Sequence, residues 1–270
     1  MEGHLHLELE AAPDGRTQVG KQFFRAPMHL SKPHWDGHTL VVQTVNCTAG
    51  IFGGDQINLS FIAKSGTRAV ITSPSAQRAY PPRDQSSPAL INQFIEAESG
   101  AWLDVIPEIF IPHKSCRIIQ RTQIVTHRDS ELLYMESMAP GRVGFGESHA
   151  FASLDWTTDF IYENRLLARE RLVLHDGSGS LKILLRHSPT AYHASAFLLS
   201  PRLDSQTSFR QDVLAMNSAE CLMAATLLHQ RAAIIRLLAG DSLSLRAGIT
   251  RLRAYLYSLL ERPAPDWRKL

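Results

Sequence analysis

Polar and apolar residues alternate over many short stretches of this chain. The clearest is His4–Glu10, where every second residue is leucine, so that a strand there would have one polar and one apolar face. Comparable stretches are Thr39–Val45, Gln56–Ile62, Thr67–Thr72, Leu90–Ala97, Ala101–Ile106, Arg117–Val125, Leu132–Met138 and Leu166–Leu174. Turn residues separate them at Asp36-Gly37, Ser65-Gly66, Ser99-Gly100, Pro140-Gly141 and Asp176–Gly179. Many short strands at this spacing predict an all-β sandwich or a solenoid-like stack.

A helical period is visible only toward the C-terminus. Apolar residues recur there at steps of four and three, at Leu245, Ile249, Leu252, Leu256 and Leu259. Asp241 or Ser242 is a suitable N-cap for this helix, and Ser205–Asn217 is expected to form a shorter one. Between them, Ala219–Ala239 is ambiguous, because its alanines and leucines favour a helix by propensity alone.

Composition and charge narrow the function classes. The 270 residues are enough for one large β domain or two smaller domains. The net charge is +2, from 28 basic and 26 acidic residues with no dense basic run, which argues against a nucleic-acid partner. The N-terminus lacks the pattern of a secretory signal, and no apolar stretch reaches the ~18 residues of a membrane-spanning helix. Cys47, Cys116 and Cys221 form no Cys-x-x-Cys pair, as expected of free thiols in a reducing cytoplasm.

The motifs of nucleotide chemistry and common hydrolases are missing. The chain has no Gly-x-x-x-x-Gly-Lys-Ser/Thr loop to wrap phosphates, no Gly-x-Ser-x-Gly elbow and no His-Glu-x-x-His helix. Catalysis of a small-molecule reaction is therefore not expected.

Five segments at wide spacing are unusual. The first is Cys47–Asp55, which ends in a Gly-Gly-Asp turn before a predicted strand. The others are Thr72–Tyr80, Trp102–Glu108, Gly141–Glu147 and Arg169–Leu172, followed near the C-terminus by Pro265–Arg268.

In this order and spacing the segments resemble the urease accessory protein UreD family, also called UreH, along nearly the whole chain. The resemblance implies a mainly β fold, a large right-handed winding of β-strands in stacked sheets with a small helical element near the C-terminus. It implies one domain over 1–270, with a β-rich part at 1–204 and a mixed α/β element at 205–270. Within that element, 219–239 is expected to form two strands joined near His229-Gln230.

The resemblance also implies a function. Such a protein is a cytoplasmic chaperone and scaffold for urease maturation and is not itself an enzyme. It works on the urease apoprotein in a complex with UreF and, through UreF, with the GTPase UreG, and it helps nickel to enter the urease metallocentre. The C-terminal helix and the strand before it are the candidates for contact with UreF. No tightly bound cofactor is expected, only transient nickel(II).

Four acids within these motifs are candidates for transient nickel contact: Asp55, Glu108, Glu147 and Glu170. Scattered carboxylates suit a conduit, because the ion must be bound weakly enough to be released. The alternative is that they are turn caps and ion-pair partners of nearby arginines. The motif residues expected to serve structure are Gly53, Gly54, Pro107, Gly141, Arg142, Gly146 and Arg171.

Other metal sites and functions stay open. The 12 histidines are scattered, and only His4 with His6, on one face of a strand, and His113 with Cys116 have a chelating look. A stable metal centre is not supported by such pairs. The alternatives to the maturation role are a metal-dependent hydrolase that uses His113, Cys116 and nearby acids, or a β-sheet interaction module unrelated to urease.

Overall fold

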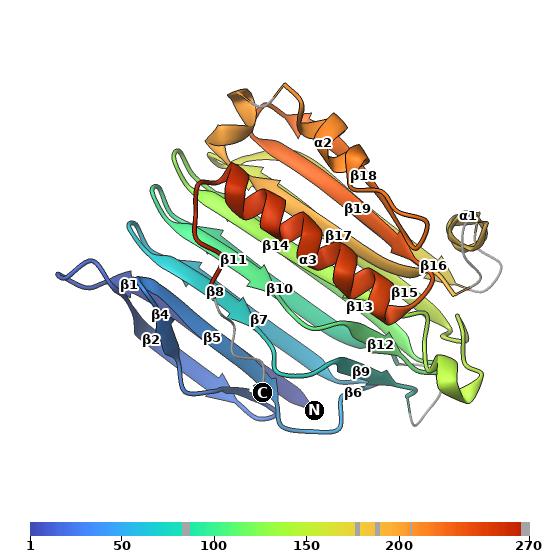
Figure 1. The fold of residues 1–270 in the computed structure, drawn as a ribbon. Helices are drawn as coiled ribbons and strands as arrows, with labels where there is room; N and C mark the ends of the chain where they lie inside the picture. Colours follow the sequence, from blue (N-terminus) through green and yellow to red (C-terminus); the bar gives the residue numbers. More distant parts are fainter. Residues whose placement is uncertain (83–86, 176–178, 187–189, 206, 266–270) are drawn as a thin grey trace.

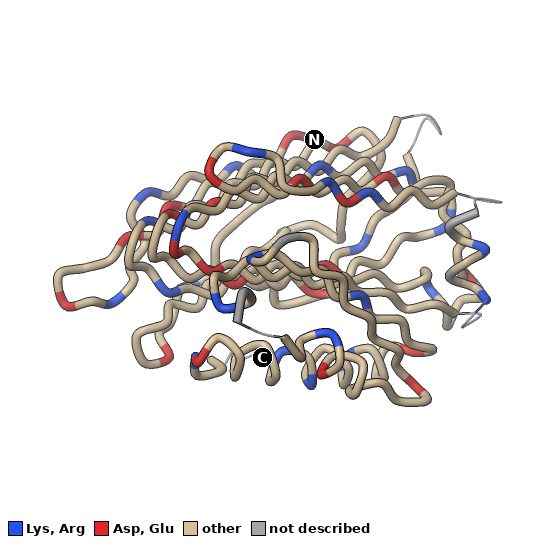
Figure 2. Tube along the Cα trace, turned by 90° about the horizontal axis from the view of Figure 1, so that it is seen from above, with Lys and Arg blue, Asp and Glu red and all other residues tan. Residues whose placement is uncertain are grey.

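The chain folds into two stacked β-sheets, and two of its helices lie over the outer face of one sheet (Figures 1 and 2). The computed structural model describes residues 1–270 except 83–86, 176–178, 187–189, 206 and 266–270. Sheet I contains, in spatial order, β16 (Arg165–His175), β15 (Ser153–Tyr162), β13 (Arg117–Thr126), β10 (Ala89–Ala97), β7 (Gln56–Ala63), β1 (Glu2–Ala11) and β2 (Thr17–Arg25). Sheet II contains β18 (Cys221–His229), β19 (Ala232–Ala239), β17 (Tyr192–Leu199), β14 (Glu131–Met138), β11 (Trp102–Ile106), β8 (Arg68–Thr72), β5 (Thr39–Asn46) and β3 (Met28–Leu30).

The remaining elements are short strands, helices and helical turns. The short strands are β4 (His34–Asp36), β6 (Ile51–Phe52), β9 (Gln77–Tyr80) and β12 (Phe110–Pro112). The helices are α1 (Gly179–Leu185), α2 (Phe209–Ala215) and α3 (Ser242–Leu259), and the 3-10 turns are η1 (Val143–Phe145) and η2 (Pro201–Ser205).

The middle of the chain winds repeatedly between the sheets. It passes from β7 in sheet I to β8 in sheet II, then through the short β9 back to β10, and repeats this path through β11, β12 and β13. Because each round adds one strand beside the previous one, β7, β10, β13 and β15 pair in parallel, as do β5, β8, β11 and β14. This arrangement confirms the mainly β, stacked-sheet fold with a helix near the C-terminus.

The main core lies between the sheets. Alternate side chains of sheet I point inward, such as Leu5, Leu7 and Leu9 of β1, and pack with inward side chains of sheet II such as Leu103. The outward side chains of β1 are half-buried, as the alternation predicted. In β14 all eight residues are buried, because the outer face of sheet II is also covered.

Helix α3 covers part of the outer face of sheet II and runs in nearly the same direction as the strands beneath it (Figure 1). The side chain of Asp241 caps it by accepting bonds from the amides of Leu243 and Ser244, both at 2.9 Å, which confirms the predicted start. Its apolar stripe, including Leu252 and Leu256, is buried against the outer face of sheet II.

Most predicted elements are confirmed. The nine predicted strand segments all lie in strands, two of which start one residue later than predicted, and Ala219–Ala239 forms the two antiparallel strands β18 and β19. The prediction of a helix over Ser205–Asn217 was too long, because the α-helix in the described part of this range is Phe209–Ala215. Strands β2, β15 and β17 were not expected. Most of the predicted turn at Asp176–Gly179 lies outside the described residues, as does the C-terminal part of the Pro265–Arg268 motif.

Charges of both signs are interspersed along the chain trace (Figure 2). Within the described residues no helix is long and apolar enough to cross a membrane.

Candidate functional site

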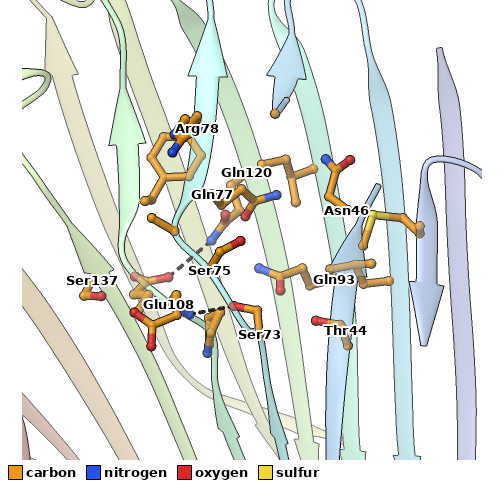
Figure 3. Close-up of a pocket in the computed structure, with 18 of the residues that line it drawn as sticks. Thr44, Asn46, Ser73, Ser75, Gln77, Arg78, Gln93, Glu108, Gln120 and Ser137 are labelled. Atoms are coloured by element: carbon orange, nitrogen blue, oxygen red, sulfur yellow. Dashed lines mark hydrogen bonds between the residues drawn. The ribbon is translucent and has the colours of Figure 1, made fainter. Parts of the chain in front are cut away.

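A polar cavity of about 180 Å³ lies between the two sheets. It is found at the end of the sandwich where the short strands β6, β9 and β12 close the side. In Figure 3 its polar side chains come from strands, such as Gln93 of β10, and from the loops that follow β8 and β11, such as Ser73, Ser75 and Glu108. The apolar stack is thus interrupted by a buried polar layer.

Glu136 is the most deeply buried acid of this layer. It sits on β14 and faces sheet I, where its Oε2 accepts hydrogen bonds from Tyr134 Oη at 3.1 Å and Gln120 Nε2 at 3.2 Å. Burial raises the pKa of Glu136 to about 7, the bond from Tyr134 opposes the rise, and the nearby charge of Glu170 adds to it. Gln93 Nε2 donates to Tyr134 Oη at 3.2 Å and completes the network. Near neutral pH this carboxyl group can therefore exist in both protonation states.

Two buried donors around the cavity have no acceptor among the residues that the structure describes. They are Asn46 Nδ2 and Trp156 Nε1, and both residues line the cavity. Trp156 is only 3% exposed, so bulk water does not satisfy its N–H. Buried donors are normally paired, so the cavity has the chemistry of a space for a polar or hydrated guest.

Glu108 is a predicted acid that the structure places at this cavity. It lies in the loop after β11, two residues beyond the end of that strand, and its backbone amide donates to Ser73 Oγ at 2.8 Å (Figure 3). Its side chain is 13% exposed, and its Oε2 lies 3.9 Å from Nη2 of Arg246 on α3. Pro107, predicted to be structural, also lines the cavity.

Glu170 lies beside the same polar layer. It belongs to β16, forms an ion pair with Arg236 of β19 and so joins the two sheets. The negative charge of Glu170 contributes to the raised pKa of Glu136.

The other two predicted acids do not line the cavity and have structural partners. Asp55 is buried, accepts a bond from the Phe52 amide at 2.9 Å and pairs with the amino group of Met1 at 2.8 Å. Glu147 forms a two-pronged ion pair with Arg142, with Nε to Oε2 at 2.9 Å, and this pair holds its pKa below the usual value. Asp55 and Glu147 therefore act as a turn cap and as ion-pair partners, which was the alternative to nickel contact.

The predicted motif residues have identifiable structural roles. A Cβ atom on Gly53 would lie 2.2 Å from Cβ of Pro82, so only glycine fits there. Gly146 ends η1 with φ of 72°, in the left-handed region that glycine favours. Gly54 and Gly141 also have positive φ values, of 85° and 143°. Arg171 pairs with Asp155 at 3.0 Å on the outer face of sheet I.

The histidine pairs do not gather further ligands. His4 and His6 share one face of β1, as predicted, but bind Glu2 at 2.9 Å and Glu8 at 3.1 Å. Within the described residues no three His, Cys, Asp or Glu side chains are grouped as metal ligands.

His113 and Cys116 are also unlike a reactive pair. His113 is buried and meets the Tyr80 ring edge-on at 4.4 Å. Burial raises the pKa of the Cys116 thiol to about 12, so it is a protonated core residue.

Several cavity residues were missed by the sequence reasoning. They are Glu136, Tyr134, Gln93, Gln120 and Trp156. One signal was available for Glu136, because it is the charged residue inside Leu132–Met138, a stretch otherwise rich in apolar residues. The alternation of polar and apolar residues in this stretch did not reveal that both faces of β14 are covered.

These observations define a class of protein: a mainly β chain wound into two stacked sheets, with a polar, acid-lined cavity between them. The family model of the UreD urease accessory protein matches residues 1–269. The chain therefore belongs to the UreD family of urease accessory proteins, and its role lies in urease maturation. The family name describes an accessory protein, which points to a non-catalytic role.

Individual relatives agree with this assignment. The chain is 33% identical over 274 residues to urease accessory protein UreD of Opitutus terrae, covering 99% of this chain and 98% of the relative. It is 28% identical over 152 residues to UreD of Trichodesmium erythraeum, covering 55% of this chain and 54% of that protein. It is 24% identical over 279 residues to urease accessory protein UreD 2 of Streptomyces griseus, covering 96% and 91%.

Proposed function

We propose that this protein is a cytoplasmic chaperone and scaffold that acts on the urease apoprotein and lets nickel(II) pass through its interior cavity. In this role it works in a complex with UreF and, through UreF, with the GTPase UreG. It performs no catalytic step itself and holds no resident cofactor, since nickel is its cargo.

The cavity between the sheets carries this proposal. Nickel(II) accepts carboxylate and other oxygen ligands in addition to imidazole and thiolate. Here Glu136 and Glu108 lie among hydroxyl and amide groups from Ser73, Ser75 and Gln93. Dedicated metal sites need three or four strong ligands. Two carboxylates among neutral groups would instead attract a hydrated dication and release it again.

The C-terminal element, residues 205–270, has exposed apolar side chains that support a contact with a partner protein. Leu214 of α2, Leu222 of β18 and Leu243 of α3 are 51%, 43% and 77% exposed. Exposed apolar side chains from three elements of this C-terminal part suit a protein contact, and UreF is the partner proposed for it.

The test is urease activation in cells that carry the urease structural genes, nickel and the other accessory proteins. We expect urease activity and urease-bound nickel to collapse without this chain, at matched apoprotein levels, and to return on complementation. Unchanged activity would refute the maturation role.

A second comparison tests the cavity itself. Glu136→Gln keeps the shape of the side chain but removes its charge, so it should lower activation while complex assembly persists. Glu98→Gln is the matched control, because Glu98 pairs with Lys64 at 2.9 Å away from the cavity lining. Equal activation by the two variants and the wild type would mean that nickel does not use the cavity.

A further inference from the structure

A second cavity, with a volume of about 730 Å³, lies beside the short strands β9 and β12. Its lining includes Tyr80 of β9, Arg142, and residues of the turn His113–Cys116 that joins β12 to β13. Among the described residues it shares no lining residue with the polar cavity between the sheets. A space of this size is in the range of small-molecule sites, and it is separate from the cavity proposed for nickel.

The charged side chains that line this cavity are all basic within the described residues. They are Lys114, Arg117 and Arg142. The charge of Arg142 is balanced by its ion pair with Glu147. The side chains of Lys114 and Arg117 have no hydrogen bond or ion pair within the described residues, although Arg117 is half-buried. The cavity therefore contains two uncompensated positive charges.

The pKa of His113 reflects the same positive surroundings. Burial lowers it, the charges of Arg142 and Arg78 lower it further, and the charge of Glu147 opposes them. At neutral pH the imidazole is therefore mainly neutral, so His113 adds a polar ring to the cavity but no charge.

The turn after β12 brings three donors together within four residues: the Lys114 ammonium, the Ser115 hydroxyl and the Arg117 guanidinium. Backbone bonds fix the turn, because the Cys116 amide donates to His113 O at 3.2 Å and the Ser115 amide donates to Ala150 O at 2.8 Å. Two cations and a hydroxyl group on a fixed turn are donors that suit an oxyanion.

We infer that this basic cavity binds a phosphate group, either as the free ion or on a small molecule. A phosphate group suits the site better than a carboxylate, because it carries about −1.5 to −2 charges at pH 7 and two unpaired cations face it. The planar guanidinium of Arg117 can donate to two phosphate oxygens, while Lys114 acts as a point charge. This site goes beyond the proposed nickel passage, since neither residue lines the inner cavity.

The test is titration calorimetry of inorganic phosphate into the purified full-length chain, with the ionic strength held constant by sodium chloride. Arg117→Gln and Lys114→Gln should each weaken phosphate binding about tenfold, the scale of a charge-assisted hydrogen bond. Lys32→Gln is the control, because Lys32 is exposed and lies outside the lining of the cavity. Since Lys114 and Arg117 are unpaired, their variants should melt like the wild type, which circular dichroism checks.

Glu147→Gln tests the site in the opposite direction. It removes the charge that balances Arg142, so phosphate affinity should rise about two- to fivefold, the scale of an exposed ion pair. A loss of fold cannot produce such a gain. Glycerol 3-phosphate should bind at least as tightly as phosphate, because the cavity is larger than the ion. Tighter binding identifies an organic phosphate as the ligand, and equal binding identifies the free ion.

Four results would each overturn the site. They are no binding of phosphate by the wild type, equal affinity for acetate and phosphate, an equal loss of affinity in Lys32→Gln and Arg117→Gln, and no gain in Glu147→Gln. All of these measurements are made without nickel or urease, so their outcome is independent of the proposed function.

Discussion

At the residue scale, Gly53 shows how one backbone position limits the sequence. An added Cβ would lie 2.2 Å from Cβ and 2.4 Å from Cα of Pro82, and a proline ring cannot turn aside. We expect Gly53→Ala to reduce soluble yield and to destabilise the fold by about 1 to 3 kcal/mol, as overpacking does. Gly144→Ala is the control, because nothing lies within 4 Å of its added Cβ. Equal yield and equal urea midpoints for the two variants would contradict this account.

Glu136 should leave a signature in the pH dependence of stability. Its pKa is raised from 4.5 to about 7 in the folded protein, chiefly by burial. The folded state therefore holds the proton more tightly than the unfolded chain, so stability falls as the pH rises through this window. The contribution of this group amounts to about 3 kcal/mol, at 1.36 kcal/mol for each unit.

Urea unfolding of the wild type and of Glu136→Gln at several pH values measures this effect. Other groups titrate in the same range, including His193, whose pKa is lowered to about 4 by burial and by Arg236. The difference between the two proteins isolates Glu136 and should favour Glu136→Gln increasingly from about pH 4.5 to about pH 7. A difference that does not change with pH would show that Glu136 is not buried in a proton-binding site.

At the element scale, alternation identified strands that have one wet face but not the others. Strand β17 is buried along nearly its whole length, because sheet I covers one face and the helices cover the other. Strand β2 lies at a sheet edge, is exposed at most positions and so has no apolar stripe. In β18 and β19, the pairing of β19 with β17 and of β18 with β19 overrides the helix propensity of alanine and leucine.

Helix α3 is fastened to sheet II by a buried charged cluster. Arg253 Nη1 donates to Asp104 Oδ1 at 3.1 Å, and Tyr257 Oη donates to the same carboxylate. Asp104 is fully buried, so Arg253→Met would remove the positive charge that pairs with it and cost about 3 to 5 kcal/mol. The double variant Asp104→Leu/Arg253→Met should recover most of this loss. Urea denaturation measures the free energy of unfolding of the single and the double variant, and Arg251→Ala is the control on the same helix. An Arg253→Met variant as stable as the wild type would refute the stabilising role of this cluster.

At the scale of the whole molecule, the candidate site combines residues that local sequence cannot connect. The motifs contain Glu108, which lines the cavity, and Glu170, which forms an ion pair with Arg236. Their arginine partners, Arg246 and Arg236, come from the C-terminal element and reach them only because that element completes and covers sheet II. Sequence could predict the acids but not the cavity, since the cavity depends on how the strands are stacked.

Because the C-terminal element completes and covers sheet II, the β-rich part, residues 1–204, should not fold without residues 205–270. Strand β17 ends at Leu199. One of its edges pairs with β14, and the other pairs with β19 over eight residues. The outer face of sheet II, with Trp102, Leu133 and Met135, is covered by elements that follow residue 204. A fragment of residues 1–204 should therefore aggregate when expressed alone, because an unpaired edge and an apolar face are both exposed. Co-expression with residues 205–270 as a separate chain should restore a soluble pair, measured by co-purification. A soluble, monomeric 1–204 fragment would instead mean that the β-rich part is a domain in its own right.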